Sequence, residues 1–183
     1  TVFHVEWNNK KLNIIDCPGS DDFIGAAMTA LNVTDTAVLL INGQFGPEVG
    51  TQNHFRYTEK LGKPVIFLVN QLDDEKCDYD AILEELSGIY GPKVVPVQYP
   101  VETGPGFNSL IDVILMKQLT WGPDGGKPTL SEIPDSEKEK AEAMHKALVE
   151  AAAENDEGLM EKFFETDHLS EDEMREGIRK GMV

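Results

Sequence analysis

Two short polar segments have the residue types and the spacing to hold a nucleotide. Residues 16–19 read Asp-Cys-Pro-Gly and residues 70–73 read Asn-Gln-Leu-Asp, and each segment follows an apolar run typical of a buried strand. An aspartate at a strand end can hold the water shell of a magnesium ion, and a glycine three residues later lets its backbone N–H approach a phosphate. A carboxylate can accept two hydrogen bonds from N1 and N2 of guanine, a donor pair that adenine lacks. The segments therefore predict a guanine nucleotide site that uses Asp16, Gly19 and Asp73.

The elements that would position these segments form an α/β pattern over residues 1–100. Alternating apolar residues around the pair Asn8-Asn9 predict a hairpin at the start. Apolar runs then alternate with helical periodicity. In chain order the pattern predicts strands at 3–7, 12–15, 37–41, 65–69 and 94–97 and helices around 23–31, 55–61 and 79–89. This order indicates a mostly parallel sheet with helical crossovers, in which ligands bind beyond the carboxyl ends of the strands.

The pattern changes after Pro100, so a second unit is expected at 101–183. A loop rich in Gly and Pro precedes one apolar stretch at 110–121, and helical periodicity follows. Ser170 and Glu173 have the spacing of a capping box for a last helix. The expected second unit is therefore small and of the α+β class.

Composition excludes several kinds of partner and site. The 183 residues carry 16 Lys and Arg against 33 Asp and Glu, and the formal net charge of −17 opposes phosphate tracking along free DNA. The longest apolar runs have strand length, below the roughly 20 residues that span a bilayer, so no membrane partner is expected. Cys17 and Cys77 lie far apart without metal-ligand neighbours, which favours neither a disulfide framework nor a zinc site. A reducing cytoplasm fits this cysteine usage best.

Longer stretches around the two polar segments resemble translational GTPases. Residues 16–23 resemble the signature Asp-Thr-Pro-Gly-His-x-Asp-Phe of these proteins, and residues 67–73 resemble their strand that ends in Asn-Lys-x-Asp. Residues 112–121 and 159–163 resemble the subdomain that is inserted into the GTP-binding domain of elongation factor G. The resemblance covers essentially the whole chain and identifies it as similar to part of domain I in the elongation factor G family.

This resemblance implies a fold and a division into two domains. Residues 1–100 would form an incomplete core of the P-loop GTPase type, without the P-loop and switch I, and residues 101–183 would form the inserted subdomain. The phosphate-binding pattern Gly-x-x-x-x-Gly-Lys-[Ser/Thr] does not occur in the sequence. We therefore expect the chain alone to bind GTP very weakly and to be inactive as an enzyme.

The resemblance also implies ligands, partners and roles for five residues. GTP or GDP and Mg²⁺ would be cofactors of the complete parent protein. Asp16 would reach the magnesium ion through water and Gly19 would approach the γ-phosphate, whereas Asn70 and Asp73 would bind guanine with Gln71 alongside. The parent would be a cytoplasmic monomer that promotes translocation on the ribosome. The region after residue 100 would meet the ribosomal stalk protein.

Three positions depart from the family pattern. Cys17 stands where the family has a threonine and is interpreted as a small buried residue. Ser20 stands where the family has a histidine that orients the attacking water, and its hydroxyl is too short to take the place of an imidazole. Loss of a positioned catalytic side chain removes roughly 10²–10⁴ in rate. Ser20 has a second interpretation, as the cap of the following helix. Gln71 stands where the family has a lysine. Glutamine keeps part of the apolar stem of the lysine side chain but has no charge.

Several functions stay open at this point. One is a paralogue that binds GTP as a conformational ligand on the ribosome with impaired hydrolysis, which Ser20 and Gln71 favour. Another is a ribosomal-protection factor related to elongation factor G. A small acidic binding module unrelated to either is the remote third.

Overall fold

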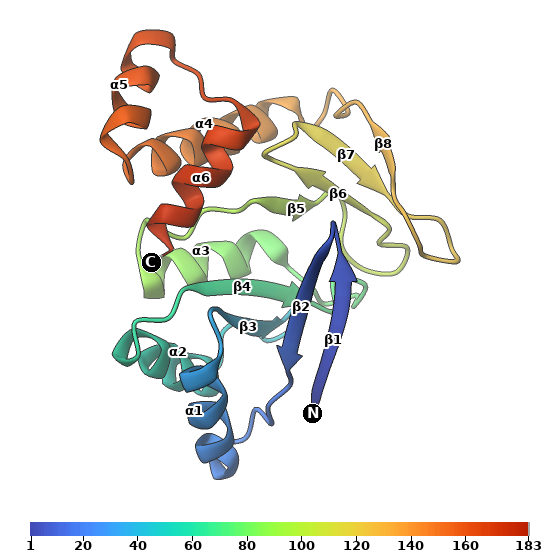
Figure 1. Cartoon of the computed structure of the whole chain (residues 1–183). Coiled ribbons are helices and arrows are strands. Elements are labelled where there is room, and N and C mark those ends of the chain that lie inside the picture. The colour runs from blue at the N-terminus through green and yellow to red at the C-terminus, as the bar shows by residue number, and fades with distance from the viewer. Residues whose placement is uncertain (183) are drawn as a thin grey trace. The chain divides into compact units, whose positions relative to one another are not determined.

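The computed structural model describes residues 1–182 and has mixed α and β elements (Figure 1). Val183, the last residue of the expected second unit, lies outside the described residues. The elements are β1 (Val2–Trp7), β2 (Lys10–Ile15), a 3₁₀ turn (Asp21–Phe23), α1 (Ile24–Val33), β3 (Ala37–Asn42), α2 (Val49–Lys60), β4 (Val65–Asn70), α3 (Tyr79–Tyr90), β5 (Gln98–Pro100), β6 (Ser109–Asp112), β7 (Lys117–Thr120), β8 (Thr129–Ser131), α4 (Lys138–Ala153), α5 (Glu157–Thr166) and α6 (Glu171–Gly181).

The chain divides into two compact units, which are described separately. The first unit comprises Thr1–Ile41 and Pro47–Leu68. The second comprises Asn42–Gly46 and the chain from Val69 onward, so the division passes through β3 and β4. The predicted boundary at residue 100, which concerns where an inserted subdomain begins, stays a prediction.

The first unit opens with the predicted hairpin. Strands β1 and β2 are antiparallel, and the two turn residues Asn8 and Asn9 have φ values of 47° and 59°. Two consecutive residues in the left-handed region match the twist of the strands they join, and asparagine tolerates this conformation better than most residues. Phe3 pairs with Ile14, and both side chains are exposed. The hairpin is a two-stranded sheet of its own.

Strands β3 and β4 form the parallel pair that the sequence predicts. The backbone N–H of Ala37 donates to the carbonyl of Pro64 at one end of the pair, at 2.9 Å. At the other end the N–H of Gly43 donates to the carbonyl of Asn70, also at 2.9 Å. The N-terminal ends of β3 and β4 therefore lie side by side, and so do their C-terminal ends, which makes the two strands parallel. On one face of this pair the apolar side chains are exposed, namely Val38, Leu40, Ile66 and Leu68.

The mostly parallel sheet predicted for residues 1–100 is only partly found. Among residues 1–182, β3 and β4 form one sheet, and the remaining strands form two separate antiparallel sheets. The strand predicted at 94–97 is wrong, because the strand begins only at Gln98 and pairs antiparallel with β6. The run 94–97 contains Pro96, which has no backbone N–H for a central ladder.

The second unit contains a four-stranded antiparallel sheet in the order β5-β6-β7-β8. Figure 1 shows α4, α5 and α6 gathered beside this sheet. Tyr99 and Ile111 from the sheet pack with Ala141 and Leu148 from α4 in one buried core. This part of the fold therefore combines an antiparallel sheet with helices, and its identification as a subdomain at 101–183 stays a prediction.

Helix α6 carries the capping box that the sequence predicts. The Ser170 hydroxyl accepts from the Glu173 backbone N–H, and the Glu173 carboxylate accepts from the Ser170 N–H at 2.8 Å. Glu173 also pairs with Lys162 of α5 at 2.5 Å, so the cap ties two helices together. Within residues 1–182, none of the helices has the length and apolar character needed to cross a bilayer.

Candidate functional site

The first predicted half of the site is the loop that follows β2. Asp16, Gly19 and Ser20 are all exposed. A Cβ atom built on Gly19 would meet no heavy atom within 4 Å, so the space beside this backbone is open. The loop also lies near the first turn of α2, because a Cβ on Gly50 would be 3.8 Å from the Gly19 carbonyl oxygen. An exposed carboxylate and an open backbone therefore share one loop.

Ser20 does not cap the helix that follows it. Its backbone carbonyl accepts from the Phe23 N–H at 2.9 Å, which closes the 3₁₀ turn. Helix α1 has Phe23 at its N-cap position, and no side chain caps it. The helix-cap interpretation of Ser20 is therefore wrong, and the exposed hydroxyl has no structural role of that kind.

The second predicted half is the loop after β4, which belongs to the second unit. Asn70 ends the strand, and Gln71 has a φ of 60°, in the left-handed region. The carbonyl of Gln71 accepts from the Asp74 N–H at 3.1 Å, so Asp73 lies inside a tight turn. The side chains of Asn70, Gln71 and Asp73 are exposed. The fold therefore brings the three predicted guanine residues into one accessible loop.

Asn42, at the end of β3, holds this loop and was not identified from the sequence. Its side-chain Nδ2 donates to Gln71 Oε1 at 2.7 Å. Its Oδ1 accepts from the N–H groups of Gln44 at 2.8 Å and Phe45 at 3.2 Å. The amide thus bonds both its own turn and the neighbouring loop. An asparagine before Gly signals such a turn, but the contact with a residue 29 positions away has no local signal.

A second loop, after β5, also contacts the 70–73 region. The backbone N–H of Gly104 donates to the carbonyl of Leu72 at 2.8 Å. The Thr103 hydroxyl donates to the carbonyl of Cys77 at 2.9 Å. Sequence reasoning assigned no role to these two residues beyond their place in a loop rich in Gly and Pro.

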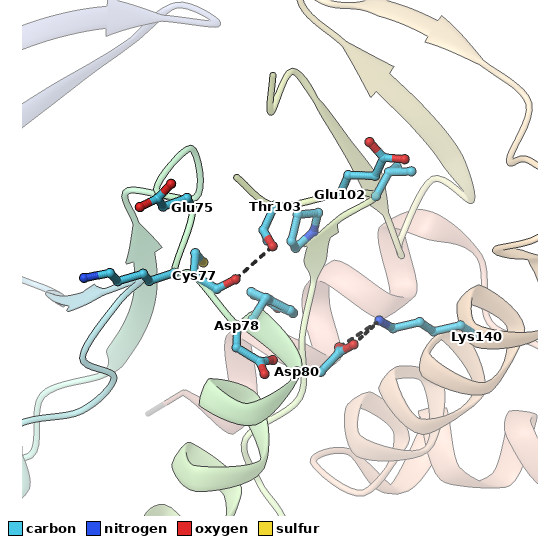
Figure 2. A pocket seen from close by; sticks show the side chains of 11 residues that line it. Glu75, Cys77, Asp78, Asp80, Glu102, Thr103 and Lys140 are labelled. Atoms are coloured by element: carbon cyan, nitrogen blue, oxygen red, sulfur yellow. Dashed lines mark hydrogen bonds and ion pairs between the residues drawn. The ribbon is translucent and has the colours of Figure 1, made fainter. Parts of the chain in front are cut away.

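A cavity of about 640 Å³ lies between these segments of the second unit. Figure 2 shows Thr103 directed at Cys77 on one side and the ion pair of Asp80 with Lys140 on the other. That pair has an Nζ–Oδ1 distance of 2.7 Å. Asn70, Gln71 and Asp73 are absent from the lining of this cavity. The cavity is therefore lined by residues that follow the predicted guanine loop in the sequence, and that loop does not form it.

Electrostatics around the cavity keep the Cys77 thiol protonated. Burial raises the pKa of Cys77, and the carboxylates of Asp74, Asp78 and Asp73 raise it further. The thiolate is the reactive form of cysteine, so Cys77 is a poor nucleophile at neutral pH.

The described residues fit a guanine nucleotide better than a directly bound metal ion. Asp73 offers an exposed carboxylate and Asn70 an exposed amide on one loop, which suits the edge of a purine base. Across residues 1–182, no three His, Cys, Asp or Glu side chains gather closely enough to hold a metal.

Comparison with known proteins gives two findings. The model of the family described as the elongation factor Tu GTP binding domain matches residues 1–168. A crystal structure of a protein from Thermus thermophilus superposes with a TM-score of 0.87 and 30% sequence identity. The match covers 99% of this chain and 27% of that one, so the present chain spans about a quarter of the length of the protein it resembles.

Proposed function

The chain belongs to the elongation factor Tu GTP-binding domain family, as an elongation factor G-like translational GTPase, and from that premise we propose that it is part of a factor that promotes translocation on the ribosome. In this proposal residues 1–100 supply part of the GTP-binding core and residues 101–183 supply the inserted subdomain. The natural protein acts on cytoplasmic ribosomes as a monomer.

The loop after β4 is the observation that carries the proposal. Asn70 is the last residue of a parallel strand and Asp73 lies just beyond it, at the strand end where ligands bind in open α/β sheets. Asp73 would accept two hydrogen bonds from guanine, and Asn70 would bind the same base. An adenine base would leave that carboxylate without its donors, which costs binding free energy.

The loop after β2 supports the second half of the proposal. Asp16 would hold a magnesium ion through water, and Gly19 would present its N–H to the γ-phosphate. The open space beside Gly19 agrees with that role. Magnesium would supply charge neutralisation for the phosphate oxygens, and Asp16 would orient its water shell.

The excess of acidic over basic residues favours a protein partner over direct binding to nucleic acid. Because the whole chain has a net charge of −17, contact through residues 101–183 would favour a basic or apolar protein surface. We propose the ribosomal stalk protein as that partner, through residues 101–183.

A second candidate function is a factor that uses GTP as a conformational ligand and hydrolyses it slowly. Ser20 favours it, because this exposed hydroxyl stands where the family's water-orienting histidine would be. Gln71 favours it as well, because its side chain is hydrogen-bonded to Asn42 and carries no charge toward a phosphate.

Single-turnover GTP hydrolysis on ribosomes tests both candidates. The measurement compares the natural protein with its Ser20→His variant, after GTP binding by both has been established. Slow hydrolysis by the natural protein, with a gain of roughly 10²-fold or more in the variant, would support the second candidate. Normal hydrolysis by the natural protein would support the translocase with another group orienting the water. Absence of GTP binding would contradict both candidates.

A further inference from the structure

The segment 72–77 is hydrogen-bonded at both ends by the loop that follows β5. At one end the Gly104 N–H donates to the Leu72 carbonyl, at 2.8 Å. At the other end the Thr103 hydroxyl donates to the Cys77 carbonyl, at 2.9 Å, as the dashed line in Figure 2 shows. Asp73 lies between these two points.

Inside the segment the backbone is closed by its own turns. The Asp74 N–H donates to the Gln71 carbonyl and the Cys77 N–H donates to the Asp74 carbonyl, both at 3.1 Å. The Lys76 N–H donates to Asp74 Oδ1 at 2.8 Å. The segment is therefore a compact unit, and a bond at either end fixes its position as a whole.

The loop that makes these bonds is itself shaped for close approach. Gly104 is buried and has a φ of 93°, a backbone conformation that side chains rarely adopt. Its Cβ position lies 3.8 Å from Glu75 Cα and 3.9 Å from the Asp74 carbonyl oxygen. A side chain at this position would thus be in ordinary van der Waals contact with the segment, so the two loops approach each other closely here as well as being hydrogen-bonded.

We propose that Thr103 is a positioning residue for guanine selection, acting by holding the segment that presents Asp73. This inference rests on the proposed guanine-binding role of Asp73. Recognition by two parallel hydrogen bonds depends on the direction of the carboxylate as well as on its presence. Thr103, 26 residues beyond Cys77, therefore affects how strongly guanine is preferred over other bases.

The matched variants are Thr103→Val, which keeps the shape and removes the hydroxyl, and Thr103→Ser, which keeps the hydroxyl. A net hydrogen bond corresponds to about a fivefold change in a local equilibrium. Thr103→Val is therefore expected to loosen the segment by about that factor, and Thr103→Ser to leave it near the native state.

The first experiment measures the reactivity of Cys77 and needs no nucleotide. Cys17 is the only other cysteine, so the assay uses the 183-residue chain with Cys17→Ser. Cys77 is buried, so its labelling by a thiol reagent reports local opening of the segment. We expect labelling about fivefold faster with Thr103→Val and unchanged with Thr103→Ser. Equal rates in all three proteins would overturn the proposed bond as a determinant of the segment.

The second experiment measures binding of GDP and of inosine diphosphate, which lacks the 2-amino group, by the natural protein that contains this chain. Thr103→Val is expected to lower GDP affinity about fivefold and inosine diphosphate affinity less, so their ratio falls. Asp73→Ala gives the ratio expected when the carboxylate is missing, and Thr103→Ser should restore the native ratio.

The outcomes distinguish failure of guanine recognition by Asp73 from failure of the positioning role of Thr103. If the native protein binds both nucleotides equally, guanine recognition by Asp73 fails and the inference fails with it. If the native protein discriminates and Thr103→Val keeps the native ratio, only the role of Thr103 is overturned. An equal loss for both nucleotides would also overturn that role, because it indicates general destabilisation.

Discussion

Gly43 shows how closely the end of β3 approaches the candidate guanine loop. A Cβ atom at this position would lie 2.7 Å from the Asn70 carbonyl oxygen, 2.8 Å from the Gln71 carbonyl oxygen and 3.0 Å from Cys77 Sγ. Two of these three atoms belong to the backbone and cannot turn away. The residue therefore sets the separation between the strand end and the loop.

Gly43→Ala is expected to lower the free energy of unfolding by about 1–3 kcal/mol, the usual cost of overpacking a close contact. Urea unfolding measures the change. Gly88→Ala is the control, because Gly88 lies inside α3 with nothing within 4 Å of its Cβ position. Alanine in that helix should raise stability by roughly 0.5–1 kcal/mol. A neutral result at Gly43 would mean that the loop moves without cost.

At this scale the sequence predicts the residues whose chemistry is carried by a local motif. Asp16, Gly19, Asn70 and Asp73 could be proposed as site residues because each belongs to a short pattern at or just after the end of a strand. Asn42 and Thr103 could not, because each acts through a hydrogen bond to a residue 29 or 26 positions away. Only the fold brings such partners together.

Helix α6 provides a prediction at the scale of an element. A hydrogen bond from Lys162, followed by bonds from the backbone and side chain of Ser170, lowers the pKa of Glu173 from 4.5 to about 2. The folded state therefore favours the ionised form more strongly than the unfolded chain does. This contribution to stability is fully present above pH 4.5 and is lost as the pH falls toward 2.

The Glu173→Gln variant distinguishes the contribution of this carboxylate to the pH dependence of stability from that of the other acidic groups. The glutamine can still accept from the Ser170 N–H, but it does not titrate. Thermal unfolding from pH 7 to pH 3 should show a smaller loss of stability in the variant than in the native chain. Parallel curves for the two proteins would contradict the assigned role of Glu173.

Elements with a clear sequence period were predicted well, and the others were not. The hairpin, the capping box and the parallel pair β3–β4 follow from alternation, spacing and apolar runs. The strand expected at 94–97 begins instead at Gln98. The apolar residues of this run predict a strand, but Pro96 has no backbone N–H to donate to a neighbouring strand. Sheet membership depends on pairing between distant segments, which no single run contains.

The whole chain gives a prediction about nucleotide affinity. Its 183 residues contain no phosphate-binding pattern of the type Gly-x-x-x-x-Gly-Lys-[Ser/Thr], so the proposed site would supply only contacts to the base and one contact to a phosphate. We expect GDP and GTP to bind the 183-residue chain more weakly than micromolar. Isothermal titration with GDP and GTP, and ADP as the control nucleotide, measures this. Micromolar affinity would show that the phosphate cradle is dispensable.

The exposed face of β3 and β4 has a practical consequence for solution behaviour. Val38, Leu40, Ile66 and Leu68 present a strip of branched apolar side chains on two neighbouring strands. Such a strip is an aggregation hazard, and mutual repulsion between molecules of net charge −17 opposes it. The repulsion acts over a screening length of about 10 Å at 0.1 M salt and shortens as salt is added. Colloidal stability therefore decreases with ionic strength, and dilute buffer is the condition in which the protein is best concentrated.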